Sequence, residues 1–600
     1  MGQFRAILIA VMVSAAAAGA AHAQTVPSDP QPTCVVTPAS FASWFAAGSP
    51  SLNGVVNPAD SVTFPNSGNC SFYQWSEQMF LWMTSPAPLT YGGGGGRIFD
   101  SATFFDVSPP DASGNRTFIA HTPGLVRRLG IRTAQVGPHG LPIIFSKTGK
   151  LMEIEDMPAS AVPEIRDQTG KLTQAVHARL DKGKRLLLDA AGQAVKFVAQ
   201  PLAKIEPVLR APRPGPASPI VRKFIVDKIP IFIDSDNNVI DTEEGQAGGN
   251  DVLMAQNGSK LIYYVTMSND VFAYFLTGVK DGAITPGNQF PTTGPQLAQV
   301  VTFAAAHGRT FADPTALAIE AKSSWVEAAG LPNLSSYVTM TATIPTYNTG
   351  SSTNWTPSGQ RTVQLAMLGL HVVGSAAGHP EMIWATFEHV GNTPNAGYSY
   401  VNTGGATVPV AQSTAGTWLF AATNTTGPFN AAHMTFILTS PSASCALSTI
   451  CAAAGFTISP SNTIRWKAWG AASDARPNPL DASVAASNTE IISINDSVRG
   501  QLTAGDVRGN YLMIGSTWTI GGAAPNGSFS MSPSFNEVGT SLLNNSTMET
   551  YQQGTSALAN PPSGTLNCFT CHTSSSPTIA TTGVSHVFSH LQPLTLPPTH

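Results

Sequence analysis

The chain has 600 residues, of which 42% are hydrophobic and 11% are charged, and its formal net charge is −4. Such a sparse and nearly balanced charge gives no electrostatic basis for binding nucleic acid or anionic lipid, whereas the hydrophobic content is enough to bury a core. With 54 glycines and 46 prolines the chain is turn-rich. We therefore expect a β-rich α+β fold, with a large turn-rich main body and a short helical C-terminal segment.

The N-terminus has the pattern of an export signal. One positive charge, at Arg5, precedes an apolar run over residues 6–18, and Ala21-His22-Ala23 has the small-x-small form of a signal-peptidase site. We therefore predict a Sec-type signal peptide over residues 1–23 and a periplasmic or secreted mature chain. A retained membrane anchor is the alternative, but the run is short for a membrane span. No later apolar stretch is long enough either, so we expect no membrane span in the mature chain.

The chain contains six cysteines, and the first four are candidates for disulfide bonds: Cys34, Cys70, Cys445 and Cys451. Unpaired thiols are a liability in an oxidising compartment, so we expect these four to form two bridges. Four cysteines allow three pairings, which the sequence alone leaves open. The simplest pairing joins Cys34 to Cys70 and Cys445 to Cys451, because each bond then closes a local loop.

Charge and turn patterns divide the chain after the signal peptide into four parts. Residues 24–143 form the N-terminal part of the main body, 144–245 a charged insertion or subdomain, 246–540 the β-rich main body and 541–600 the C-terminal segment. In the first part, Phe72, Trp75, Met79 and Trp82 recur at helical spacing. We predict a helix there that Pro86 ends, with its aromatic stripe in the core; lining a cofactor is the alternative.

Two hairpins are predicted in the insertion. KRLLLDAAGQAVKFVA (184–199) has the pattern strand, turn, strand. In IFIDSDNNVIDTEEG (231–245), Asp234, Asp236 and Asn238 match the first ligand positions of a calcium loop. The match then fails, because Val239 and Gly245 stand where a glycine and a bidentate glutamate are needed. A hairpin turn explains the same residues, and we prefer it.

Three histidines lie close together in the middle of the chain. TVQLAMLGLHVVG (362–374) and EMIWATFEHV (381–390) indicate two strands joined by a short connection. His371, His379 and His389 could therefore meet in a metal or active site. The alternative, which we prefer, is that each is an ordinary core or edge histidine.

The sequence NCFTCH, residues 567–572, carries the strongest chemical signal. Cys568 and Cys571 are spaced to form thioether bonds with the two vinyl groups of one haem, and His572 is then placed to bind the iron. A redox-active Cys-x-x-Cys is one alternative, although its usual βαβ context is missing. A plain structural disulfide is another.

Zinc binding is a further alternative for the same cysteines. Cys568 and Cys571, followed by His586 and His590, have the spacing of a Cys2His2 site. Against it, the intervening TSSSPTIATTG lacks the charged, helix-forming character of a zinc finger, and exported thiols tend to oxidise. We therefore favour one covalent haem c, and the C-terminal segment is then a haem-binding segment.

NCFTCH resembles the haem-attachment site of c-type cytochromes. Upstream, QLAMLGLHVVGSAAGHPEMIWATFEHV and NNSTMETYQQ are similar to segments of large exported bacterial c-type cytochrome family proteins. The resemblance implies haem binding and electron transfer to a redox partner protein, with attachment at Cys568 and Cys571 and iron ligation by His572. Small cytochromes usually carry this motif near the N-terminus, so its C-terminal position leaves the distal iron ligand in doubt.

Two residues are candidates for the distal iron ligand. His586 lies with His590 in VSHVFSHLQPL, which we expect to be a short helix with both rings on one face. Met548 lies on a predicted helix upstream of Cys568, and its thioether would raise the reduction potential. We place His586 first, because its nearness in sequence limits the cost of loop closure.

The pattern predicts an exported mono-haem c-type cytochrome with no catalytic residues of its own. The alternative is a haem-dependent oxidoreductase whose iron keeps an open position for peroxide, oxygen or a small oxidised species. His371, His389 or Arg361 would then be distal groups. A third possibility is a protein in which the haem is structural or detects a gas.

Overall fold

The computed structural model describes residues 25–92, 96–109, 115–122, 126–131, 143–145, 151–158, 160–181, 184–197, 219–227, 229–240, 252–437, 445–446, 448–453, 455–470, 483–525, 537–540, 542–553, 568–572 and 581–597. The predicted signal peptide, residues 1–23, lies outside the described residues. So does the side chain of Cys571.

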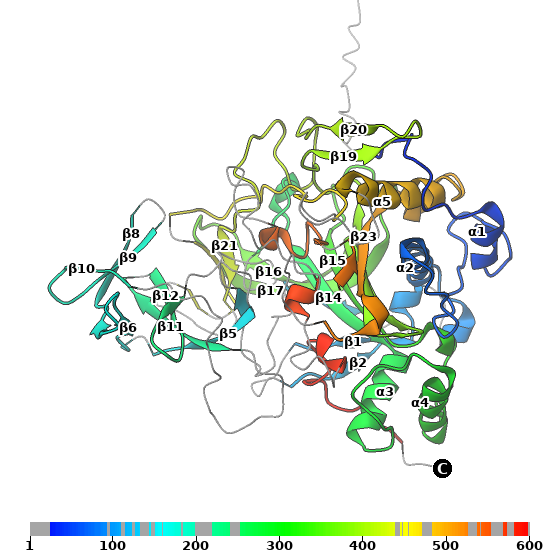
Figure 1. The fold of residues 1–600 in the computed structure, drawn as a ribbon, viewed down its shortest axis with the longest axis horizontal. Coiled ribbons are helices and arrows are strands. Elements are labelled where there is room, and N and C mark those ends of the chain that lie inside the picture. Colours follow the sequence, from blue (N-terminus) through cyan, green and yellow to red (C-terminus); the bar gives the residue numbers. More distant parts are fainter. Residues whose placement is uncertain are drawn as a thin grey trace, which may run out of the picture.

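A large, mainly antiparallel sheet forms the centre of the molecule (Figure 1). Its main path runs β2-β1-β14-β15-β17-β18-β23-β24. In chain order these strands are β1 (Phe104–Val107), β2 (Phe118–Ala120), β14 (Ile262–Asn269), β15 (Ile319–Glu327), β17 (Asn354–Ala376), β18 (His379–His389), β23 (Tyr511–Thr519) and β24 (Glu537–Gly539). The predicted strand pair around the three histidines is confirmed, since β17 and β18 are antiparallel neighbours.

Four further strands extend this sheet at its side. They are β3 (Arg127–Arg128), β16 (Thr339–Asn348), β21 (Met434–Phe436) and β22 (Ile450–Ala452). β16 pairs with β17 and, in parallel, with β3, while β22 pairs with the start of β17 and with β21. A separate two-stranded ribbon joins β19 (Tyr398–Val401) to β20 (Thr407–Val410).

Helices cover the sheet, and the two longest lie on one face. Those two are α2 (Asn69–Met83) and α5 (Val484–Arg499); shorter helices are α1 (Pro38–Trp44), α3 (Asp270–Lys280) and α4 (Gly294–Ala306). The predicted helix with its aromatic stripe is confirmed in α2, because Phe72, Trp75, Met79 and Trp82 are all buried in the core. Cores of this kind are stabilised mainly by removing apolar surface from water.

Alternation along β17 gives the sheet two different faces. Leu370 and Val372 join the core that contains α2 and α5. Val373 points the other way, into a second core with Phe272, Trp384 and Phe569, and His371 lies on that same face by alternation. The second face therefore receives the C-terminal segment.

The described residues between 143 and 240 fold into small sheets of their own, drawn at the left of Figure 1. One sheet holds β4 (Ile143–Phe145), β5 (Leu151–Asp156), β11 (Ile220–Val226), β12 (Ile229–Ile233) and β13 (Val239–Ile240); the others hold β6 (Glu164–Arg166) with β7 (Leu172–Gln174), and β8 (His177–Asp181) with β9 (Lys184–Leu188) and β10 (Ala194–Val195). Their buried side chains, such as Ile165, Leu187 and Phe224, form a cluster that contains no residue of the main sheet.

Both predicted hairpins of this region are confirmed. β9 pairs with β10, and β12 pairs with β13. At the second turn, Asp234 accepts hydrogen bonds from the backbone N–H groups of Asp236 and Asn238, at 2.9 and 2.8 Å. These bonds form an Asx turn that closes the hairpin, which accounts for Asp234 at this position.

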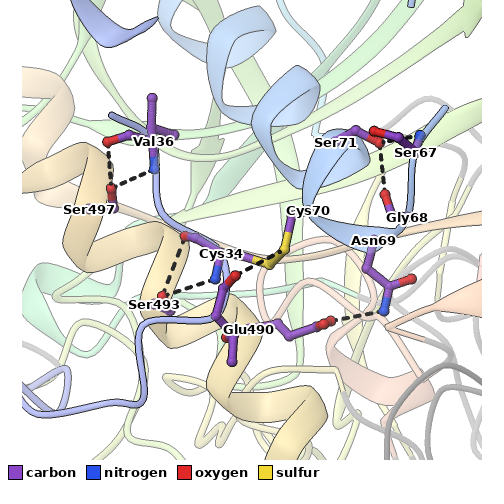
Figure 2. The surroundings of a disulfide bond; sticks show 11 residues. Cys34, Val36, Ser67, Gly68, Asn69, Cys70, Ser71, Glu490, Ser493 and Ser497 are labelled. Carbon is purple, nitrogen blue, oxygen red and sulfur yellow. Dashed lines mark hydrogen bonds between the residues drawn. A yellow bond between two sulfur atoms is a disulfide. The ribbon is translucent and has the colours of Figure 1, made fainter. Parts of the chain in front are cut away.

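The two simplest cysteine pairings are present as disulfides. One joins Cys34 to Cys70 and the other Cys445 to Cys451. Figure 2 shows the first at the start of α2, beside Ser493 of α5, whose hydroxyl is 3.2 Å from the Cys34 backbone nitrogen. These bonds are compatible with a periplasmic or secreted protein. Among the described residues, no helix combines the length and apolar character that crossing a membrane requires.

The C-terminal segment differs from its prediction. The expected helix in VSHVFSHLQPL is wrong: a 3-10 turn over Thr582–Val584 leads into irregular turns through residue 590. The expected helix around Met548 is also wrong, because that stretch has turns and the 3-10 turn Thr550–Gln552. The helical part of the motif is α6 (Cys568–Cys571), a single turn.

Candidate haem-attachment site

Residues 568–572 of the motif lie against the second face of the central sheet. α6 ends at Cys571, and the backbone N–H of His572 donates to the Cys568 carbonyl at 2.8 Å. Phe569 is fully buried, and its ring lies 5.9 Å from that of Trp384 on β18. Phe569 therefore fixes the turn of helix that carries Cys568 on the sheet.

The ring of His572 is held by one hydrogen bond. Its Nδ1 lies 2.8 Å from the carbonyl oxygen of Val584. A carbonyl can only accept, so Nδ1 carries the proton and Nε2 carries the lone pair. This is the tautomer that a metal-binding histidine adopts when a backbone carbonyl orients it.

Electrostatics keep this ring neutral. Burial lowers the pKa of His572 well below its usual value, and the charge of His586 lowers it further, against the opposing hydrogen bond to Val584. The charges of Lys322 and His371 also lower the pKa of His572. Only the neutral imidazole can bind a metal, so the site favours the required form of His572.

His586 lies directly on His572. The two rings stack with centroids 3.9 Å apart and planes inclined by 14°. On another side, the Trp384 ring centroid is 4.2 Å from that of His572. A nitrogen lone pair lies in the plane of its ring, so two stacked imidazoles do not aim their lone pairs at an atom between them.

The Cys568 thiol is half-buried and forms no disulfide. Burial raises its pKa, and the carboxylates of Glu549 and Glu537 raise it further. Thiol–disulfide exchange requires a thiolate, so this environment is opposite to that of a redox-active Cys-x-x-Cys. The side chain of Cys571 lies outside the described residues.

A buried charged group lies on the same sheet face as the motif. Glu549 accepts from His371 at 3.0 Å and lies 3.9 Å from the Lys322 ammonium. Burial alone would raise the pKa of Glu549, but His371 and Lys322 hold it below its usual value. The group therefore keeps a carboxylate close to Cys568.

The three other histidine and arginine candidates are separated from one another. Buried His379 contacts Glu381 at 2.8 Å. His389 stacks on Tyr337 at 3.7 Å, and burial lowers its pKa to about 3. The exposed Arg361 forms a two-pronged ion pair with Glu327. The structure does not bring His371, His379 and His389 together, and each has its own partner.

Met548 is fully buried in a third core cluster, with Leu253 and Phe420, which does not contain Cys568 or Phe569. Of the two candidates for the distal ligand, only His586 contacts His572 among the contacts of the described residues.

Within the described part of the chain, a single group of three metal-type ligands has donor atoms within 4.8 Å of one another: Cys34, Cys70 and Glu490. Its two sulfurs are bonded as a disulfide, so they cannot act as thiolates (Figure 2). Cys568, His586 and His590, the described members of the Cys2His2 alternative, do not form such a group.

Trp384, Glu549 and the Val584 carbonyl were missed by sequence reasoning. No local pattern marks them, because they lie far from one another along the chain and meet only through folding. No protein-family model, curated protein or solved structure matches the chain. The motif and the geometry around it are therefore the basis for a functional proposal.

Proposed function

We propose that this protein is an exported mono-haem c-type cytochrome that passes single electrons to a redox partner protein. Cys568 and Cys571 would hold one haem c covalently, and His572 would bind its iron. The observation that carries the proposal is the combination of the Cys-x-x-Cys-His sequence with a neutral His572 whose Nδ1 is committed to Val584. That combination leaves Nε2 as the ring atom able to bind iron.

The surrounding residues suit a haem, which when bound would supply one-electron chemistry. Phe569 of the motif is buried with Trp384 and Phe588, and these rings limit the access of water. The half-buried Cys568 keeps its thiol protonated and outside any disulfide. Glu549, held ionised by His371 and Lys322, provides a fixed charge near the site.

We propose His586 as the distal ligand, ahead of Met548, because its ring lies on that of His572. The stacked rings do not share a target for their lone pairs, so ligation by both would require them to part. The same observation supports the second candidate function, a haem-dependent oxidoreductase whose iron keeps an open position. Of its candidate distal groups, His371 lies on the sheet face that receives the motif, by alternation with Val373. Zinc binding is the third candidate; its described ligands, Cys568, His586 and His590, are not within 4.8 Å of one another.

The test is to produce the full chain in a host that has the haem-attachment machinery and in one that lacks it. We expect a coloured protein only in the first host, with an intact mass larger than that of the mature polypeptide by one haem. A six-coordinate low-spin spectrum supports electron transfer, whereas a high-spin spectrum supports the oxidoreductase.

The matched control replaces a different cysteine pair. Cys568→Ser with Cys571→Ser should remove the covalent haem, while Cys445→Ser with Cys451→Ser should keep it. A parent protein that is colourless and has only its polypeptide mass would refute the proposal. If that colourless protein holds one zinc ion, the Cys2His2 alternative replaces the haem proposal.

A further inference from the structure

A cavity of about 630 Å³ lies apart from the haem motif, beside the first face of the sheet. It is open to solvent on one side and is lined by the chain after α2, by the segment around Asp100, and by strands β3, β16 and β17. Its polar lining residues are Arg97, Asp100, Arg127, Thr339, Thr341 and Gln364, with Met340 among the apolar ones. The volume lies within the range of small-molecule sites.

Arg127 cannot serve as the anion-binding group of this cavity, because acidic residues already neutralise it. Its Nε lies 3.2 Å from Asp100 and 3.5 Å from Asp106. Its Nη2 donates to the Phe99 carbonyl at 2.8 Å. Arg127 is thus a fixed part of the wall.

Arg97 is different. Its Nη1 donates to the Thr84 carbonyl at 2.6 Å, but among the described residues no carboxylate lies within 4.0 Å of its guanidinium. Burial lowers the pKa of Arg97, and repulsion from Arg508 lowers it further. Asp506 opposes this effect only in part, since its carboxylate is bound to Arg508 at 2.6 Å. A partly buried charge without a counterion is costly.

We propose that this cavity binds a small monocarboxylate that also carries hydroxyl or amino groups. Arg97 would receive the carboxylate, because a guanidinium matches its two oxygens. Asp100 would accept from the donors of the ligand, and Thr341 and Gln364 from the strands would complete the polar wall. Asp100 disfavours a phosphate, which carries more negative charge and, when fully ionised, has no donor to offer.

The test measures binding of gluconate, lactate and L-serine to the full protein by calorimetry at constant ionic strength, with acetate and inorganic phosphate as comparison ligands. We expect saturable binding of at least one of the first three, at one site per molecule, and weaker binding of acetate and phosphate. Arg97→Gln should weaken that binding by about ten- to a hundredfold, since a hydrogen bond to a charged group is lost.

Arg128→Gln is the matched control, because Arg128 is the exposed neighbour of Arg127 on β3 and does not line the cavity. A second variant, Thr341→Trp, should block binding sterically from an exposed strand position, in case Arg97→Gln does not fold. The proposal fails if none of the three ligands binds, if phosphate binds most tightly, or if folded Arg97→Gln binds as the parent does.

Discussion

His572 depends on two constraints that act on one ring. Burial keeps the imidazole neutral, which preserves a lone pair, and the Val584 carbonyl fixes which nitrogen carries it. Neither is sufficient alone, because a charged ring has no lone pair and an unanchored neutral ring can present either nitrogen. The turn at Thr582–Val584 therefore matters to the site as much as the histidine itself.

The identity of the distal ligand can be tested at His586, which follows the turn Thr582–Val584. If His586 binds the iron, His586→Ala should leave the haem covalently attached but convert its low-spin spectrum to a high-spin one. His590→Ala, four residues along the segment, is the control and should keep the parent spectrum. Absorption spectra and intact masses check both. A low-spin His586→Ala protein would show that another residue, with Met548 the next candidate, binds the iron.

Glu77 on α2 is a buried carboxyl whose burial costs stability. Its Oε1 has no hydrogen-bond partner among the described residues, and burial raises its pKa to about 8, against the opposing charge of Arg499. From pH 4.5 to about 8 the unfolded chain has lost this proton while the folded chain retains it. The free energy of unfolding must therefore fall as pH rises through that window.

Glu77→Gln should remove this pH-dependent loss. We expect the variant to match the parent near pH 5 and to exceed it at pH 8 by on the order of a few kcal/mol. Urea unfolding at both pH values measures the difference, and Glu164→Gln, at an exposed position on β6, is the surface control. Equal gains in stability at the two pH values would contradict a raised pKa of Glu77 as the cause of the pH dependence.

Among the elements, α2 is held from three directions. Its start is bonded to the N-terminal segment through Cys70 and Cys34, and Asn69 donates to Glu490 of α5 at 2.9 Å (Figure 2). Its middle packs closely on β17, where a Cβ at Gly374 would lie 2.9 Å from the Trp75 ring. The helix thus joins the N-terminal segment, α5 and the sheet into one core.

The two disulfides should differ in what they contribute. The Cys34–Cys70 bond spans 36 residues and the Cys445–Cys451 bond spans 6. Loop-closure entropy then predicts a loss of about 4 kcal/mol for Cys34→Ser with Cys70→Ser, and about 2 kcal/mol for Cys445→Ser with Cys451→Ser. Denaturant unfolding compares the two double variants directly. A larger loss of unfolding free energy for the Cys445/Cys451 variant would mean that the N-terminal segment stays docked on α2 and α5 without its disulfide.

Over the whole molecule, sequence patterns predicted the elements that depend on interactions between residues close together in the chain. The aromatic stripe of α2, the β17–β18 pair and the Asp234 turn each follow from spacing within a few residues. The C-terminal segment was predicted less well, because distant backbone contacts determine its path. Arg116 exchanges two backbone hydrogen bonds with the segment 590–592, and Asn288 accepts from Thr581. These bonds replace the expected helix, and no local pattern encodes them.

The candidate site shows the same division. Cys568, Cys571 and His572 are adjacent in sequence, so the motif itself was predictable. The residues that orient and bury it come from β18, from the region of Glu549 and from the segment after residue 580. Their meeting depends on the second face of the sheet, which only the folded chain defines.

The insertion offers a test of how this large molecule is divided. Its strands pair only with one another among the described residues, and its buried clusters contain no residue of the main sheet. A chain in which residues 144–245 are replaced by a short Gly/Ser linker should therefore keep the central sheet, both disulfides and the proposed attachment site. We expect one covalent haem by intact mass, the parent absorption spectrum, and a cooperative unfolding transition with a smaller denaturant dependence, because less surface is exposed on unfolding.

Replacing Leu187 and Phe224 with Ala in the full chain is the companion variant: it should disrupt only the insertion and leave the haem spectrum unchanged. If either variant loses the haem, the insertion supports the attachment site, and the separation of cores does not correspond to independent folding.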